Sequence, residues 1–219
     1  LINDKKGVTV WIPDYFCNGS LWPIRSTNAK IVFYPVGLDL EPKWDICQKM
    51  VANRPPDLFV LVHYFGAPAK ADTAHSFCQN HNALLVEDAA HAVGPTPGIG
   101  EFGDFIIYSP YKIFPVPDGG LLLVKNKQAA GLLGQIHADL CVTQTATGTW
   151  ILKRLVQKIL PILASTFAKS KNQPDFDDDP PYVPLPRRAQ LSLPAWRMLK
   201  RCSHSLYQIK TPRVEISRS

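Results

Sequence analysis

Leu84-Leu85-Val86-Glu87-Asp88-Ala89-Ala90-His91 is the stretch of sequence that decides the fold. It opens with an apolar, strand-forming run, and two acidic residues follow immediately. A continuous apolar run of this length is typical of a strand covered on both faces. Two carboxylates at the end of a buried strand are costly unless a cationic group meets them. The stretch therefore predicts a buried strand that ends at a polar site.

Further apolar runs of the same character lie between residues 8 and 124. Together with the quoted stretch they predict the strands Val8–Ile12, Lys30–Tyr34, Leu58–His63, Ala83–Glu87, Asp104–Tyr108 and Leu121–Val124. Between them, Glu41–Asn53 and Ala69–His81 carry apolar residues at helical spacing. Asp39 or Glu41 ahead of Pro42 predicts the start of the first helix. This alternation predicts an α/β fold that is doubly wound around a mainly parallel sheet.

The pattern changes after about residue 125, where a helical C-terminal part is expected. The predicted helices are Asn126–Asp139, the basic amphipathic Trp150–Ala168, and Ala189–Lys210. Asn172–Pro186 is rich in Asp and Pro, which predicts an exposed connector. The predicted domains are a large α/β domain at 1–125, a helical extension at 126–171, a linker at 172–186 and the start of a small C-terminal region at 187–219.

Composition narrows the class of protein. The chain has 219 residues, of which 46% are apolar, and this is enough for one sizeable core. Its apolar runs are all shorter than the ~20 residues of a membrane-spanning helix, so we expect a soluble protein. Five scattered cysteines without a Cys-x-x-Cys pair predict neither a zinc site nor a disulfide framework, and they fit a reducing cytoplasm. A net charge of +6, concentrated after residue 150, favours solvated helix faces over a nucleic-acid surface.

Polar residues follow the predicted strands at the edge where ligands bind in open α/β sheets. Asp88 and His91 follow one strand, Ser109 and Lys112 follow the next, and Asp118–Gly120 leads into another. Taken singly, each has a commoner structural explanation: a solvated lysine, a helix-capping aspartate, a structural histidine. Their order and spacing together favour one shared site.

The motifs Val62–Gly66, Glu87–Gly94, Gly100–Asp104, Ser109–Lys112 and Asp118–Gly120 occur in this order along the chain. The combination resembles the DegT/StrS family of sugar aminotransferases, which use pyridoxal 5′-phosphate as cofactor. The resemblance covers about residues 7–125 and implies an aspartate-aminotransferase-like large domain of fold type I. It also implies that the family's N-terminal segment, which grips the cofactor phosphate, is missing from the domain at residues 1–125. A first residue other than Met also predicts a fragment.

The resemblance implies a role for each residue that matches the family pattern. Lys112 forms the Schiff base with the cofactor aldehyde and then moves the proton, so it is the catalytic residue. Asp88 pairs with the pyridine nitrogen and keeps the ring an electron sink. His91 lies against the ring or its hydroxyl oxygen, and Ser109 binds the phosphate. The candidates for an aromatic side chain stacked on the ring are Tyr15 and Phe16.

The function implied by the resemblance is transfer of an amino group from an amino acid, glutamate, to a nucleotide-linked keto-sugar. The setting is surface-polysaccharide or secondary-metabolite sugar synthesis in the cytoplasm. The expected assembly is a homodimer without a metal ion, a nucleic acid or a membrane partner. Lys112 disfavours the related deoxygenating enzymes, which have His at this position. The alternatives are a non-catalytic binding or regulatory relative that keeps the scaffold, and an α/β domain whose acids and lysine are structural.

Overall fold

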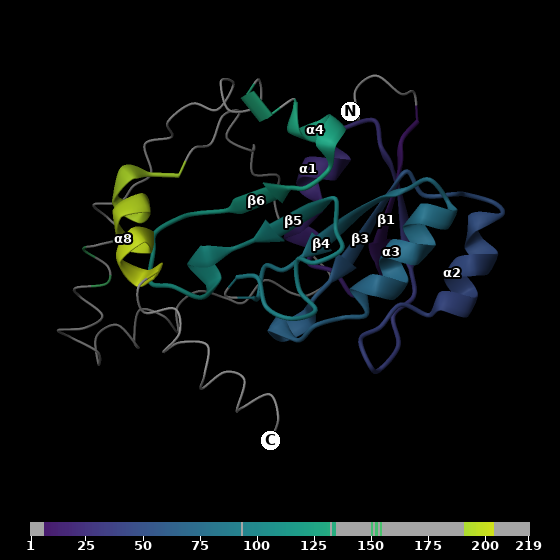
Figure 1. Cartoon of the computed structure of the whole chain (residues 1–219), viewed down its shortest axis with the longest axis horizontal. Coiled ribbons are helices and arrows are strands. Elements are labelled where there is room, and N and C mark those ends of the chain that lie inside the picture. The colour runs from purple at the N-terminus through teal and green to yellow at the C-terminus, as the bar shows by residue number, and fades with distance from the viewer. Residues whose placement is uncertain are drawn as a thin grey trace, which may run out of the picture.

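The computed structural model describes residues 7–92, 94–131, 133–134, 150, 152, 154 and 191–203. These residues form a six-stranded sheet with the order β2-β1-β3-β4-β5-β6 (Figure 1). The strands are β1 Thr9–Pro13, β2 Lys30–Tyr34, β3 Leu58–Val62, β4 Leu84–Asp88, β5 Phe105–Tyr108 and β6 Leu121–Val124. Strands β1 to β5 pair in parallel, and β6 runs antiparallel to β5. The predicted mainly parallel α/β fold is confirmed.

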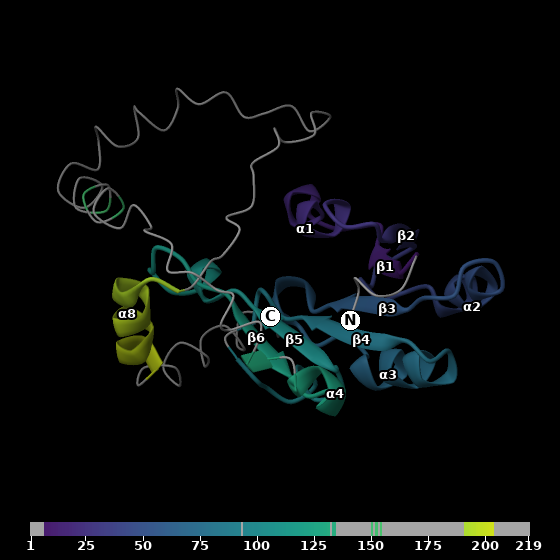
Figure 2. The ribbon, with the colours of Figure 1, turned by 90° about the horizontal axis from the view of Figure 1, so that it is seen from above.

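Helices cover both faces of this sheet. The α-helices are α1 Trp22–Arg25, α2 Trp44–Val51, α3 Ala71–Asn80, α4 Lys127–Ala130 and α8 Leu193–Ser203. The 3-10 helices are η1 Asn18–Ser20, η2 Tyr64–Gly66 and η3 Pro110–Lys112. Seen from above, α1 lies on one side of the central strands, and α2 and α3 lie on the other (Figure 2). Apolar side chains are therefore needed on both faces of each central strand, which explains the continuous apolar runs in the sequence.

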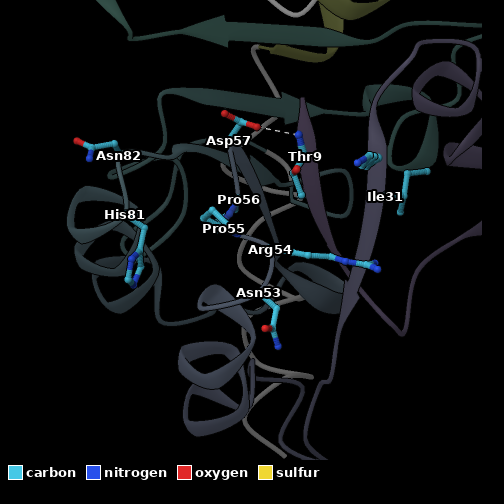
Figure 3. A pocket seen from close by; sticks show the side chains of 10 residues that line it. Thr9, Ile31, Asn53, Arg54, Pro55, Pro56, Asp57, His81 and Asn82 are labelled. Carbon is cyan, nitrogen blue, oxygen red and sulfur yellow. Dashed lines mark hydrogen bonds between the residues drawn. The ribbon is translucent and has the colours of Figure 1, made fainter. Parts of the chain in front are cut away.

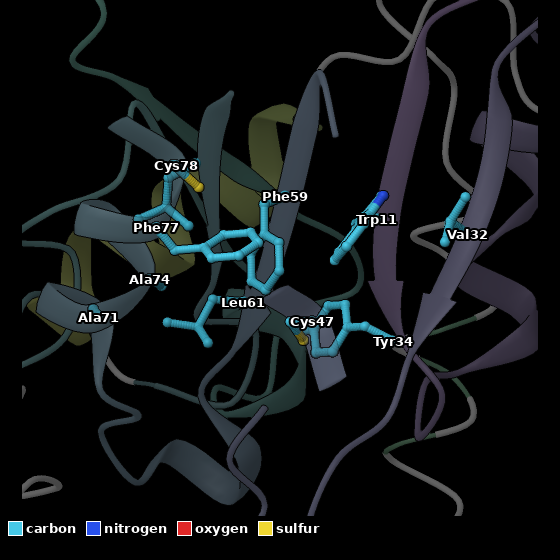
Figure 4. Packing of buried hydrophobic residues seen from close by; sticks show 11 residues of the cluster. Trp11, Val32, Tyr34, Cys47, Phe59, Leu61, Ala71, Ala74, Phe77 and Cys78 are labelled. Atoms are coloured by element: carbon cyan, nitrogen blue, oxygen red, sulfur yellow. The ribbon is translucent and has the colours of Figure 1, made fainter. Parts of the chain in front are cut away.

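Successive side chains in the central strands point to opposite faces and build two core clusters. On the side of α2 and α3, Trp11, Phe59 and Leu61 pack with Cys47 and Phe77 (Figure 4). The other cluster lies on the side of α1. Its buried members are Val8, Val10, Ile12, Leu21, Val60, Val62 and Val86.

The predicted start of the first long helix at Asp39 or Glu41 is wrong, because α2 begins at Trp44. Gly37 N–H donates to the carbonyl oxygen of Glu41, and Leu40 between them has φ 62°. This turn holds the segment before Pro42 outside the helix. A local capping pattern is overridden here by a turn that fixes the backbone in a left-handed conformation.

The remaining helix predictions are only partly covered by the structure. Of the predicted Asn126–Asp139, residues 127–130 and 133–134 are helical, and 135–139 lie outside the described residues. The connector Asn172–Pro186 and most of Trp150–Ala168 also lie outside the described residues. Helix α8 begins at Leu193, inside the predicted Ala189–Lys210. No helix within the described ranges is long and apolar enough to cross a membrane.

Glu87, near the end of β4, is fully buried, and both of its carboxylate oxygens accept hydrogen bonds. His63 Nε2 donates to Oε2 over 2.8 Å. The Nδ1 atom of His63 accepts from Ala69 N–H at 3.0 Å, so the ring proton is on Nε2. The backbone N–H groups that also donate to this carboxylate are those of Gly100, Phe102 and Gly103. Burial raises the pKa of Glu87, but the hydrogen bonds from His63 and from these N–H groups outweigh it and lower the pKa to about 2.

Replacing Phe59 tests the larger core cluster. Phe59→Ala is expected to lower the free energy of unfolding by about 4 kcal/mol, because the ring is fully buried among other aromatic rings and its loss leaves a cavity. The midpoint of urea denaturation measures this change. Phe33→Ala, at a β2 residue that is 47% exposed, is the control and should cost less than about 1.5 kcal/mol. Equal losses in the two variants would contradict the assigned core.

Replacing Glu87 tests the buried carboxylate. Glu87→Gln is expected to lower the free energy of unfolding by about 3 kcal/mol at pH 7. An amide NH2 cannot accept the N–H bonds that the carboxylate accepts. The folded pKa lies below the ordinary value of 4.5, so the stabilisation is complete above about pH 4.5 and is lost as the pH falls through about 2. Urea denaturation at pH 7 and pH 3 should therefore show a smaller acid effect in the variant. Glu101→Gln, on the exposed neighbouring loop, should match the wild type at both pH values.

Candidate active site

The topology of the sheet directs attention to the carboxyl ends of β1 and β3. The chain leaves β1 over the α1 face and leaves β3 over the α3 face, so a topological switch point lies between these adjacent strands. Ligands of open α/β sheets bind at such points. Tyr15 follows β1 and Tyr64 follows β3, with their ring centroids 5.4 Å apart. The Tyr64 hydroxyl donates to the Tyr15 carbonyl oxygen at 2.7 Å, which ties the two segments together.

Asp88 ends β4 on the face opposite to Glu87, because side chains alternate along a strand. In the sheet register it aligns with Val62 of β3 and Ile107 of β5. One carboxylate oxygen accepts the N–H of Ala90 at 3.0 Å, and the side chain is only partly buried. The two neighbouring acids thus have different surroundings: Glu87 is enclosed by donors, and Asp88 lies at the accessible edge.

His91 lies next to Lys112, which the 3-10 helix η3 places beyond the end of β5. The Lys112 Nζ atom is 3.4 Å from His91 Nε2. Burial lowers the pKa of His91, the Lys112 ammonium lowers it further, and the Asp88 carboxylate acts in the opposite direction. A neutral His91 whose Nε2 accepts from the ammonium fits this arrangement. Asp88 at the end of β4 and Lys112 beyond the end of β5 therefore have opposite effects on the pKa of the same imidazole ring.

The other predicted site residues lie around this cluster. Ser109 is the partly buried N-cap residue of η3, one turn before Lys112. Tyr15 is 57% exposed at the rim and stacks on Tyr64. Phe16 packs against the core cluster on the α1 face. Of the two aromatic candidates, Tyr15 is the one whose ring stays at the sheet edge.

Two residues to which the sequence analysis gave no role are prominent here. His63 holds Glu87, and the ring of Phe65 lies parallel to that of His91, with 6.3 Å between centroids and 6° between planes. Both belong to the motif Val62–Gly66. The period of two along β3 and β4 could have placed His63 near Glu87, but only once the register was known.

A cavity of about 720 Å³ lies at the opposite edge of the sheet (Figure 3). Its walls come from the starts of β1 and β2 and from the loops that precede β3 and β4. Asp57 accepts the N–H of Thr9 there at 2.8 Å. This cavity is therefore separate from the cluster around Lys112. Among the described residues, no group of three or more His, Cys, Asp and Glu side chains is placed to hold a metal ion.

The side chains of the cluster fit the groups that pyridoxal phosphate presents. Asp88 has a carboxylate that would pair with the pyridine nitrogen, and Lys112 has a primary amine that would bind the aldehyde. Ser109 has a hydroxyl that would donate to the phosphate, and His91 has a flat imidazole that would lie against the ring. Asp88 ends β4 and Lys112 lies in η3 just beyond the adjacent strand β5, so the amine and the carboxylate lie at one edge of the sheet. This donor set is compatible with the cofactor.

Comparison with known proteins identifies the family. The model of the DegT/DnrJ/EryC1/StrS aminotransferase family matches residues 4–150. A DegT DnrJ EryC1 StrS aminotransferase from Brucella abortus has a similar structure, with a TM-score of 0.53 and 20% identity over 63% of this chain and 40% of that chain. DesI, solved in the presence of its TDP-sugar product, has a TM-score of 0.53 and 22% identity over 63% of this chain and 36% of its own. NtdA from Bacillus subtilis, with bound cofactor PMP, has a TM-score of 0.50 and 16% identity over 57% of this chain and 29% of its own.

These similarities set the level of the conclusion. At such identities the solved structures establish the fold, and the chain spans about two fifths or less of each relative's length. The family model, in contrast, matches well over half of this chain. The chain therefore belongs to the DegT/DnrJ/EryC1/StrS aminotransferase family, whose members depend on pyridoxal phosphate.

Proposed function

We propose that this chain carries the cofactor-binding part of an aminotransferase that moves an amino group from glutamate to a nucleotide-linked keto-sugar. The observation that carries the proposal is the cluster at the sheet edge: Lys112 Nζ is 3.4 Å from His91 Nε2, and Asp88 ends β4 beside the strand that leads to Lys112. Family membership supports the reaction class. A nucleotide-sugar acceptor is supported by DesI, which was solved with its TDP-sugar product.

Each residue of the cluster has a defined task in this proposal. Lys112 binds the cofactor through Nζ and, once displaced by the donor, holds and moves the proton of the donor Cα. Asp88 keeps a proton on the pyridine nitrogen, and when bound the cofactor supplies an electron sink for the carbanion at that Cα. His91 supports the ring from one face, and Ser109 donates to the phosphate. The neutral state of His91 lets its Nε2 accept from the Lys112 ammonium.

The organisation proposed for the whole protein follows the family. We infer a homodimer in the cytoplasm, with residues 1–125 as the cofactor-binding domain and residues 187–219 as the start of a smaller region. The proposed site makes no use of a metal ion. Size-exclusion chromatography with light scattering measures the oligomeric state directly.

Lys112 is tested by colour. Protein loaded with pyridoxal phosphate is expected to be yellow and to lose this colour on borohydride treatment. Lys112→Ala and Lys112→Arg should both be colourless after dialysis, because neither side chain offers a primary amine, and Arg keeps the charge beside His91. Lys49→Ala, at an exposed position of helix α2, is the control and should stay yellow. A yellow Lys112→Arg that borohydride still bleaches would assign the cofactor to another lysine.

The amino donor is tested on the same protein. Glutamate is expected to convert the wild type to the pyridoxamine form, which absorbs at shorter wavelength. A yellow protein that responds to no amino acid would instead support the non-catalytic, regulatory relative. A protein that takes up no cofactor would contradict the proposal.

Asp88 is tested by the rate of the same conversion. Asp88→Asn is expected to slow it at least about a hundredfold, because an amide does not keep the pyridine nitrogen protonated. Stopped-flow spectroscopy with glutamate measures the rate, and retained yellow colour shows that cofactor is bound. Asp45→Asn, on the exposed side of α2, serves as the control. A normal rate in Asp88→Asn would remove Asp88 from the mechanism.

A further inference from the structure

Phe65 has a backbone conformation that bulky residues rarely adopt. It lies in η2 with φ 56° and ψ 14°, in the left-handed region. Gly66 follows with φ 82°, and a Cβ at this position would lie 2.7 Å from the carbonyl oxygen of His91. The turn is thus held directly against the backbone of His91. Strained conformations of this kind persist where the surrounding structure enforces them, and they are concentrated at functional sites.

The side chain of Phe65 contributes little packing to the core, so packing does not offset this strain. The residue is 74% exposed, so burial does not account for an aromatic ring at this position. The ring instead lies nearly parallel to the His91 imidazole at 6.3 Å. The Nε2 atom of that imidazole is 3.4 Å from Lys112 Nζ. Phe65 therefore presents an open aromatic face beside the residue that borders the reactive amine.

We propose that Phe65 is a specificity-determining residue that contacts the sugar ring of the acceptor. This inference rests on the proposed function. The carbonyl carbon of the acceptor must reach the position of the Lys112 amine, so the sugar ring lies next to His91 while the diphosphate and base extend away. Binding sites combine apolar and aromatic walls with a few polar groups, and the C–H face of a sugar packs on an aromatic ring. The exposed ring of Phe65 supplies such a wall.

The test is equilibrium binding of nucleotide sugars by calorimetry to the full chain loaded with pyridoxal phosphate. The probes are dTDP-glucose against dTDP, and UDP-N-acetylglucosamine against UDP. Phe65→Leu is expected to weaken binding of the preferred nucleotide sugar about tenfold and to leave binding of the nucleoside diphosphate unchanged. Phe65→Asn should give the same result, and it removes the strain because Asn tolerates the left-handed conformation. Phe33→Leu, also at an exposed Phe, is the matched control and should bind as the wild type does.

Several results would overturn the inference. One is a wild type that binds neither nucleotide sugar more tightly than its nucleoside diphosphate. Another is an unchanged affinity in both Phe65 variants. Equal weakening of nucleotide sugar and nucleoside diphosphate would place the ring against the base instead of the sugar. Colour and the response to glutamate report on the proposed function and binding reports on Phe65, so the two can fail independently.

Discussion

Glu87 is a carboxylate without access to water, and its need for hydrogen-bond donors organises this edge of the sheet. His63 after the end of β3 and the N–H groups of Gly100, Phe102 and Gly103 meet it from two different loops. A buried charge left without such partners costs several kcal/mol, so these contacts hold both loops against β4. The segment after β3 and the loop before β5 are therefore fixed relative to β4. The groups around Lys112 are built on this rigid base.

The neighbouring acid, Asp88, lies in a different environment because of one residue of strand geometry. Alternation along β4 sends Glu87 toward α3 and Asp88 toward the face of α1. Glu87 accepts the hydrogen bonds that join two loops to β4. Asp88 places a carboxylate at the edge where His91 and Lys112 meet. A pair of adjacent acids thus serves stability and, in the proposed function, cofactor chemistry. Each acid of the motif therefore has a separate role at the strand end.

The same edge contains one of the strained turns of the described chain. Phe65 and Gly66 both have positive φ, and they lie between the rigid pair of His63 and Glu87 on one side and His91 on the other. A fixed base is a requirement for holding such a turn, because a mobile loop would relax to a common conformation. The contacts of the buried carboxylate therefore support the turn that exposes the aromatic ring beside the reactive amine.

The sequence by itself determined the strands, the parallel α/β architecture and the order in which Asp88, His91, Ser109 and Lys112 follow the strands. Apolar runs and the residues after them are local properties, so they can be read from the sequence without knowing what packs against what. Only the tertiary structure decided that Glu87 is the enclosed acid, that His63 is its partner, and that Phe16 turns into the core while Phe65 stays exposed. Those outcomes depend on the register between β3 and β4 and on the turn at Phe65 and Gly66, which packs against the backbone of His91. Register and turn conformation arise from contacts between distant segments, which a local sequence pattern does not encode.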